Sequence, residues 1–482
     1  TGFSEWLSHV YYDEDLTALL SLYDFAEDEE IRAQAGLVIG LLLLDMALNS
    51  WRGVFGSTHG RAYENTKKWT ACEGTTDTTK LLFGMGIYSG FNNMSAPAFV
   101  LSSYRPPPAV VAIAQDVART GENRQRMGLR LDELEAWGLR PDNFEDGMHC
   151  LTLEAYFHPR TARHTLRMLD TCRWWENRFF LAVRPYRSLL KALDAVGGLP
   201  LLARVLERDI CRNTREEVNI YTYKTPDYML STAQDYRKGY GGDQQHIWQA
   251  TLGPDAVCFT THPARLEGRT PDYWAGSGLL PRAAQYRNVA VIIYKLEKIP
   301  ALYVPIRHFY THAWLPRDRF DEVVEADGWI FARKGEGYLA LRSQHPYFWN
   351  EGRPVDGPIA IRLAEEDRGR EVVVPGRHNI WICQLGRRAE DGDFAAFVRA
   401  LRAAPLVFED LRVTFHSPGN GEIRFGWEGP LQVNGVPFPL SGYPRYENPY
   451  LRVPFPATDL QPFSDLGLCG TTACSCPYIP LR

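Results

Sequence analysis

The chain has 482 residues, of which 45% are hydrophobic and 23% are charged. A chain of this length and composition buries a large core, which excludes an intrinsically disordered protein. The 53 basic and 58 acidic side chains give a formal charge of -5, which argues against a general nucleic-acid-binding protein. Aromatic residues make up 12% of the chain and serve either as core packing or as flat platforms for a ligand.

The first part of the chain has the apolar spacing of successive helices joined by short links. Its most apolar run, from Ala33 to Leu44, ends at Asp45 and is too short to span a membrane, so we expect a buried helix there. Acidic residues precede this run, as helix N-termini favour. The predicted helices are 15–25, 29–51, 108–120, 123–138, 161–183 and 186–208.

After residue 213 the apolar runs shorten to the length of strands. Two Asn-Gly pairs, at 420–421 and 434–435, predict tight hairpins, because this dipeptide accepts the positive φ angles of a type I′ turn. The glycines in 335–338 indicate a further hairpin turn, and 393–404 has the period of a helix. The predicted strands are 289–294, 338–341, 359–363, 372–374, 380–385 and 411–415.

These patterns predict an α+β multidomain protein with a helical domain over 1–212 and an antiparallel sheet domain over 213–482. Most of the nine cysteines are isolated, which is not typical of a disulfide framework. Cys469, Cys474 and Cys476 cluster, and we interpret them as a disulfide or free thiols, with zinc binding as the alternative. The sequence starts at Thr1 without a signal-peptide pattern, so it says nothing about export.

The polar segment 56–65 follows the most apolar helix and carries four groups suited to acid–base chemistry. His59 accepts a proton near neutral pH, and Tyr63 donates one when its phenol lies beside a cation. Arg61 and Asn65 can stabilise a carboxylate or an enolate-like charge. We expect these side chains in a cleft, while the alternative is a helix-capping loop with a buried histidine.

A second polar group opens the sheet domain. Gln244, His246 and Trp248 alternate in sequence, so on an extended segment they lie on one face and form the wall of a cleft. The alternative is an edge strand with aromatic residues covering the sheet. His262 with His246 gives only a weak metal-site signal, and a structural role is the preferred interpretation. Tyr236, Arg237 and Tyr240 belong to the same group.

A third group surrounds Trp274 and Arg282, which glycines flank. The indole face suits a pyranose ring, and the guanidinium suits a carboxylate. Core packing of Trp274 is the alternative. The chain has no phosphate-binding loop, no dinucleotide fingerprint, no HExxH and no GxSxG motif, which argues against nucleotide enzymes, metalloproteases and hydrolases with a serine elbow.

A helical half followed by a sheet domain that opens with NIYTYKTPDYMLSTAQDYRKGYGGDQQHIW and continues through TTHPARLEGRTPDYWAGSGLLPR resembles the polysaccharide lyases. The resemblance is to the groups with an α/α toroid and an antiparallel β-sandwich, such as heparinase II/III-like, alginate and chondroitin or hyaluronate lyases. It lies in the layout of most of the chain rather than in exact motifs. The helical half is short for a complete toroid.

This resemblance implies β-elimination on a uronic-acid-containing polysaccharide in a cleft between toroid and sandwich. His59 would be the base, Tyr63 the acid, Arg61 and Asn65 the carboxylate partners, and His246 the contribution of the sheet domain. It further implies a secreted or periplasmic protein without a nucleotide cofactor, a membrane span or a nucleic-acid partner, and a structural divalent metal in the sheet domain stays open. The substrate-binding residues would be Tyr236, Arg237, Tyr240, Gln244, Trp248, Trp274 and Arg282.

Two other functions remain open at this point. A toroid glycoside hydrolase would need a pair of carboxylates on either side of the sugar, and Glu64, Glu154 and Asp243 are the candidates. A non-catalytic carbohydrate-binding protein would keep the aromatic platforms without the chemistry. The sequence gives no oligomeric state, no choice of polysaccharide and no endo or exo preference.

Overall fold

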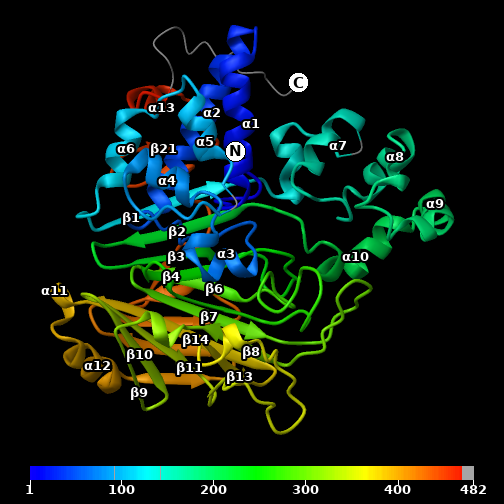
Figure 1. Ribbon diagram of the computed structural model, residues 1–482. Helices are drawn as coiled ribbons and strands as arrows, with labels where there is room; N and C mark the ends of the chain where they lie inside the picture. The colour runs from blue at the N-terminus through cyan, green and yellow to red at the C-terminus, as the bar shows by residue number, and fades with distance from the viewer. Residues whose placement is uncertain (92, 142, 469–482) are drawn as a thin grey trace.

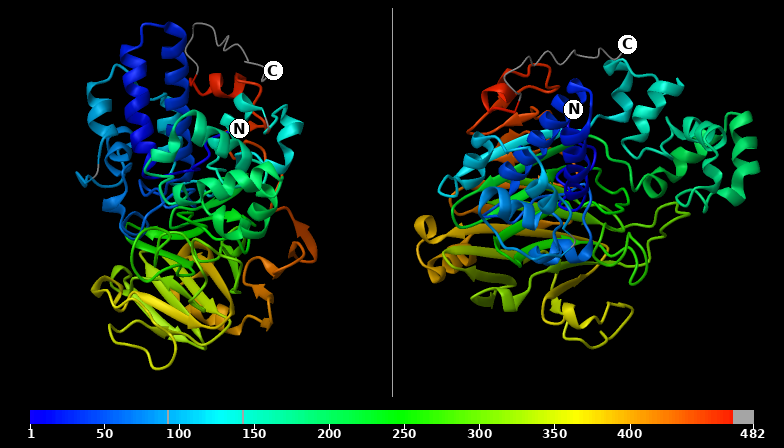
Figure 2. Two further views of the ribbon diagram at one scale, coloured as in Figure 1. Left: turned by 90° about the vertical axis from the view of Figure 1, so that its right-hand side faces the viewer. Right: turned by 45° about the horizontal axis from the view of Figure 1, so that its top comes forward.

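The computed structural model describes residues 1–91, 93–141 and 143–468. It combines helices with antiparallel sheets, with 31% of the residues helical and 25% in strands. The first helices lie over one side of the strands, and the helices from α7 to α10 extend to one side of the body (Figure 1). The left view in Figure 2 shows the helical layer above the strands. The predicted α+β class is confirmed, whereas an α/α toroid is not.

The helices of the N-terminal part form a layer and an arm. Helices α1 and α2 pack side by side, and α2 also contacts α6. Helices α8, α9 and α10 contact one another in the arm. The helices are α1 (Tyr11–Phe25), α2 (Glu29–Asn49), α3 (Glu64–Lys68), α4 (Thr76–Phe83), α5 (Ser95–Leu101), α6 (Pro108–Gln115), α7 (Phe144–Leu151), α8 (Ala162–Thr171), α9 (Arg187–Ala195), α10 (Leu199–Ile210), α11 (Arg388–Asp391), α12 (Phe394–Ala403) and α13 (Gln461–Asp465).

The strands form three antiparallel sheets. A ten-stranded sheet has the order β12-β13-β8-β5-β4-β3-β2-β1-β20-β21, a six-stranded sheet β6-β7-β14-β11-β10-β9, and a five-stranded sheet runs from β15 to β19. The strands are β1 (Gly121–Met127), β2 (Val218–Lys224), β3 (Met229–Gln234), β4 (Trp248–Gly253), β5 (Ala256–Thr261), β6 (Arg282–Tyr286), β7 (Val289–Lys295), β8 (Tyr310–Trp314), β9 (Glu322–Ala326), β10 (Trp329–Lys334), β11 (Gly337–Ser343), β12 (Phe348–Trp349), β13 (Glu371–Pro375), β14 (His378–Arg387), β15 (Leu406–Glu409), β16 (Arg412–Ser417), β17 (Gly421–Gly426), β18 (Leu431–Val433), β19 (Val436–Phe438), β20 (Tyr446–Glu447) and β21 (Arg452–Val453).

The main core lies on both faces of the ten-stranded sheet. It joins Leu42 of α2, Ile220 of β2 and Ile292 of β7 in one buried cluster, and β3 contacts β6 and β7 of the six-stranded sheet. A second core fills the space between the six-stranded sheet, α12 and the five-stranded sheet. The ten-stranded sheet is therefore covered by helices on one face and by strands on the other.

Helix α2 is long and apolar enough to cross a membrane by length and composition alone, and 56% of its most apolar window is buried in the protein. Its residues from Leu42 to Asn49 are all buried. The core helix of a soluble protein passes the same test. The sequence predicts burial of this helix in the core, because Asp45 interrupts the apolar run. In the structure the Asp45 carboxylate accepts hydrogen bonds from Tyr446 and Gln125.

Several predicted elements differ from the structure. The helix predicted over 123–138 is wrong at its start, since β1 pairs with β2 along its whole length and buries alternate residues. The long helix over 161–183 ends with α8, and Arg173 has a φ of 57°. The helix over 186–208 is broken into α9 and α10 at Gly197 and Gly198, and 359–363 forms no strand. Because β1 joins the sheet from within 1–212, the boundary at 212 stays a prediction.

The hairpin predictions are confirmed, and one differs in its loop. Asn434 and Gly435 have φ angles of 51° and 78° in a two-residue loop that pairs Val433 with Val436, as a type I′ turn requires. The hairpin at 420–421 has a three-residue loop, because Ser417 pairs with Gly421. The turn at 335–336 joins β10 to β11, and the helix over 393–404 is α12.

Candidate functional site

The two main polar segments of the sequence meet in the structure. The loop after α2 runs beside the start of β4, and the backbone N–H groups of His59 and His246 each donate to the carbonyl of the other at 2.9 and 2.8 Å. Ala62 N–H donates to the Gln244 carbonyl at 3.0 Å. The predicted association of His59 with His246 therefore exists, as a backbone bridge just before β4, an interior strand of the ten-stranded sheet.

The imidazoles at this bridge are sealed from solvent. The rings of His59 and His246 stack with centroids 5.8 Å apart, and His9 lies 3.9 Å from His59. His59 is fully buried, its Nδ1 donates to the Leu7 carbonyl, and burial lowers its pKa to about 3. His59 is therefore a neutral residue of the core, without the contact with a cleft that the lyase mechanism requires.

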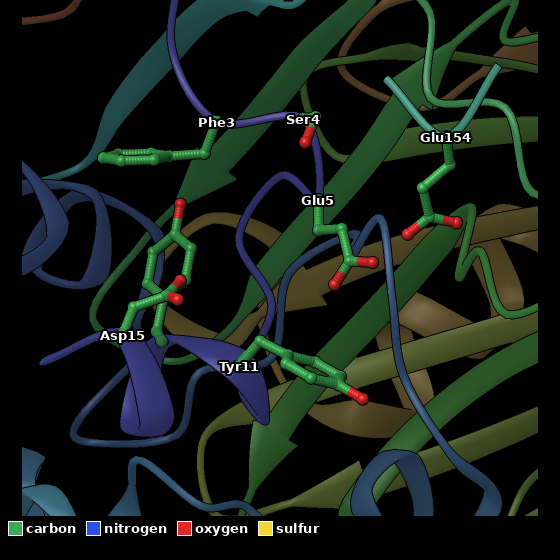
Figure 3. Close-up of a pocket in the computed structure, with 7 residues that line it drawn as sticks. Phe3, Ser4, Glu5, Tyr11, Asp15 and Glu154 are labelled. Atoms are coloured by element: carbon green, nitrogen blue, oxygen red, sulfur yellow. The ribbon is translucent and has the colours of Figure 1, made fainter. Parts of the chain in front are cut away.

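An open cavity of about 320 Å³ lies next to this core, between the N-terminal segment 1–10, the start of α1 and the turn after α7. Figure 3 shows the carboxyl groups of Glu5 and Glu154 pointing toward each other, with Tyr11 beside them. The cavity has aromatic walls and three carboxyl groups. Its lining residues are Phe3, Ser4, Glu5, Tyr11, Tyr12, Asp15 and Glu154.

Arg61 connects the two facing carboxyl groups. Its Nη2 forms ion pairs with Oε1 of Glu5 and with Oε1 of Glu154, and its Nε also donates to Glu5. Each of these three side chains is less than one-fifth exposed. Because both oxygens bind the same nitrogen, the two carboxyl groups lie next to each other at one guanidinium.

The environments of the two carboxyl groups push their pKa values in opposite directions. Burial and the hydrogen bond to Glu154 raise the pKa of Glu5 to about 7. Burial also acts on Glu154, but the charge of Arg215, the hydrogen bond from Glu5 and the charge of Arg61 together lower its pKa below the ordinary value. Near neutral pH the pair therefore holds one acid and one carboxylate, as general acid–base catalysis requires.

Tyr63 and Asp15 complete the polar surroundings of the cavity. The hydroxyl groups of Tyr63 and Tyr11 are 3.3 Å apart, and the Arg61 guanidinium lies 4.9 Å from the centre of the Tyr11 ring. Burial and this hydrogen bond raise the pKa of Tyr11. Burial and Glu14 raise the pKa of Asp15 to about 6. Arg61 and Tyr63 do not line the cavity, but they contact Glu5, Glu154 and Tyr11, which do.

Several predicted binding residues have structural contacts instead. Tyr236 is buried, donates to the Thr214 carbonyl and packs edge-on against Trp6. Arg237 donates to the carbonyls of Cys211 and Thr214, and Tyr240 donates to Glu207. These contacts tie the loop after β3 to the end of α10, away from the residues that line the cavity.

The remaining aromatic candidates lie in the core. Trp248 and Trp274 are fully buried, and their indole N–H groups donate to Thr260 and Asp367. Arg282 forms a salt bridge with Asp235 and donates to the Gly426 carbonyl. Their partners are all within the protein, so we assign them to packing.

Gln244 and Asn65 are also outside the cavity lining. Gln244 is buried and its amide N–H donates to Thr270, while Asn65 is exposed on α3. His262 is buried between the His308 carbonyl and the Leu279 N–H, which is the structural role predicted for it. Cys469, Cys474 and Cys476 lie outside the described residues, and the other six cysteines are free, as their isolation in the sequence indicates.

One acidic group has the spacing of a metal site among the residues that the structure describes. Oxygen atoms of Glu64, Glu366 and Asp367 lie within 4.8 Å of one another. Arg362 pairs with all three carboxylates, and Lys68 pairs with two of them. The two cations offset two of the three negative charges and between them pair with every carboxylate, so these carboxylates favour the ion pairs over a metal ion. A divalent metal in the sheet domain stays a prediction.

Glu5, Tyr11 and Arg215 are residues of the site that the sequence analysis did not select. Glu154 was selected only for the hydrolase alternative, together with Glu64 and Asp243. The one local signal is the φ of 52° at Glu154, a left-handed conformation that non-glycine residues adopt mainly where the structure holds them, and it is visible only in three dimensions. No family model, no curated protein and no solved structure matches this chain.

Proposed function

We propose that the protein is a glycoside hydrolase in which Glu5 and Glu154 form the catalytic carboxyl pair. The observation that carries the proposal is the meeting of two carboxyl groups at one guanidinium, at the wall of an open cavity. A carboxylic acid held protonated near neutral pH can protonate a leaving oxygen. A neighbouring carboxylate can attack the sugar carbon or stabilise its positive charge.

The closeness of the two carboxyl groups bears on the stereochemical course of the proposed reaction. Inverting enzymes leave room for a water molecule between carboxyl groups roughly 6.5–9.5 Å apart, whereas retaining enzymes hold them about 5 Å apart. Both Oε1 atoms bind Nη2 of Arg61, and this close approach supports a retaining course over an inverting one. Glu5 would then act as acid and base, and Glu154 as nucleophile.

Arg61 and the aromatic walls have supporting roles in this mechanism. Arg61 keeps Glu154 ionised and holds both carboxyl groups in place. Phe3, Tyr11 and Tyr12 make up the aromatic part of the cavity lining, and aromatic rings pack well against the apolar side of a pyranose ring. A carbohydrate substrate belongs to the same proposal.

The test is cleavage of a panel of neutral and uronic-acid-containing oligosaccharides, followed by new reducing ends. Glu154→Gln and Glu5→Gln should each lower kcat by about 10²–10⁴-fold, because each removes one proton-transfer or nucleophilic group. Glu14→Gln is the matched control. Glu14 is an exposed carboxylate in the first turn of α1, near the cavity, but it does not line the cavity. Full activity of both pair variants would refute the proposal.

A lyase is the second candidate, and the Tyr11–Tyr63 hydroxyl pair beside Arg61 favours it. In this alternative Tyr63 protonates the leaving oxygen and Arg61 meets the uronate carboxylate. Its product carries a carbon–carbon double bond that absorbs in the far ultraviolet, whereas hydrolysis gives saturated products. Unsaturated products that vanish in Tyr63→Phe but persist in Glu154→Gln would replace the hydrolase with the lyase.

A further inference from the structure

The arm formed by α8, α9 and α10 presents apolar side chains to solvent. None of the residues of α9 is buried, and α10 exposes Leu201 and Val205, which lie one helical turn apart on one face. Phe179 is 88% exposed in the segment between α8 and α9, and Val196 is 80% exposed between α9 and α10. Single exposed apolar residues are ordinary, whereas a group of them on contacting elements marks an interaction surface.

The arm is also basic, although the chain as a whole is acidic. Residues 162–210 hold nine Lys and Arg side chains against five Asp and Glu, a formal charge of +4, whereas the whole chain has -5. Ion pairs within the arm neutralise part of this charge. Arg173 and Arg178 are exposed and form no ion pair with any residue that the structure describes, so free positive charge precedes the exposed Phe179 in the chain.

A second exposed apolar surface lies at the turn between α1 and α2 and has the opposite charge. The first 31 residues of the chain hold nine Asp and Glu side chains and no Lys or Arg. In the acidic tip, residues 22–31, Phe25 is 83% exposed, and Leu22 and Ile31 are exposed as well. Glu27 and Glu29 are exposed and have no ion-pair partner within the described part of the chain.

The arm and the acidic tip do not meet within one molecule. Figure 1 shows the turn between α1 and α2 at the top of the molecule and α9 at the outer end of the arm, and the left view in Figure 2 also keeps them apart. Each surface therefore leaves apolar side chains in water beside charge of one sign, while the same chain carries its complement. A second copy can cover both surfaces, because the arm of each copy can meet the tip of the other.

We infer that the basic, apolar arm of one copy docks on the acidic tip of a second copy, and that two such contacts related by a two-fold axis close a dimer. Opposite charges then face each other around apolar side chains that become buried. An anionic lipid surface would attract the arm but repel the tip and leave Phe25 uncovered, so it accounts for only one of the two surfaces. None of these residues lines the cavity beside Glu5 and Glu154, so the inference is independent of the proposed hydrolase.

Analytical ultracentrifugation of charge-reversal variants tests the contact. The wild type should form a dimer at about 50 mM salt and dissociate at least about tenfold more readily at about 500 mM. Reversal in the arm, by Arg173→Glu with Arg178→Glu, should weaken the dimer at least about tenfold, because like charges then face each other. Reversal in the tip, by Glu27→Arg with Glu29→Arg, should do the same. A chain with all four changes should regain the dimer, since the charges have exchanged places.

The matched control is Arg353→Glu with Arg452→Glu, which reverses two exposed arginines outside both surfaces and should leave the dimer intact. A wild type that stays monomeric at about 100 µM and about 50 mM salt would overturn the inference. So would a dimer that neither reversal weakens, or a four-change chain that stays monomeric. Binding of a monomeric wild type to vesicles of phosphatidylserine and phosphatidylcholine would assign the arm to a lipid surface and also overturn it.

Two further variants decide if a charge reversal prevents folding, which circular dichroism would show. Phe25→Ser and Phe179→Ser change side chains that are more than four-fifths exposed, so the fold of one copy should tolerate them. Each should weaken the dimer at least about tenfold, because each removes an aromatic ring from the contact. A dimer of unchanged affinity in both variants would overturn the inference.

Discussion

The buried imidazole of His59 predicts a specific loss of stability in acid. Its pKa is lowered to about 3 by burial, whereas the unfolded chain has the ordinary value of 6.5. A histidine with a lowered folded-state pKa leaves stability unaffected above 6.5 and costs stability as pH falls below it, because only the unfolded chain then takes up the proton. Between about pH 8 and about pH 5 this single group should cost about 2 kcal/mol of unfolding free energy.

His59→Asn isolates this contribution, because the asparagine amide can still donate to the Leu7 carbonyl but does not titrate. Urea unfolding of both proteins at the two pH values gives the stability difference between them. The wild type should lose about 2 kcal/mol of its advantage in acid, whereas Leu43→Ala, a buried apolar control, should show the same difference at both pH values. A His59→Asn difference independent of pH would refute a sealed, neutral His59.

Three other predictions concern the carboxyl pair of Glu5 and Glu154, the buried ion pair of Lys68 and Asp367, and the turn at Gly435. Activity on an aryl glycoside should fall as pH rises through about 7 because Glu5 loses its proton, and Glu5→Gln should abolish that limb; an unchanged limb would contradict the assignment. Asp367→Asn leaves the fully buried Lys68 without one of its two carboxylates and should cost about 3–5 kcal/mol in urea unfolding; less than about 1 kcal/mol would refute it. Gly435→Ala, at a φ of 78°, should cost about 1–2 kcal/mol, and no measurable loss would contradict the turn geometry.

The elements that were predicted well depend on local physics. The hairpin at Asn434 and Gly435 is specified by two residues that tolerate positive φ, and α12 by its own apolar period. β1 could not be predicted in this way. Its sequence GENRQRM is polar and fits a helix, and it becomes a strand because β2 supplies a complete row of hydrogen-bonding partners.

The candidate site was predictable only in part, because local sequence patterns indicate some of its residues while others come together only through contacts between distant parts of the chain. Arg61 and Tyr63 lie in a polar segment after an apolar helix, and that local pattern indicated them. Glu5 and Glu154 are far apart in sequence, and only the packing of the N-terminal segment against the turn after α7 brings them to one guanidinium. His59 fits the same local pattern as Arg61, but its burial follows from the bridge to His246.

The central claim is that Glu154 attacks the sugar while Glu5 supplies the proton. A 2-fluoro glycoside with a good leaving group slows the hydrolysis of a covalent intermediate, so mass spectrometry of the digested protein locates the labelled residue. The account predicts a label on the peptide that contains Glu154, and none in Glu154→Ala. A label on a different residue, or hydrolysis with inversion and no label, would contradict it.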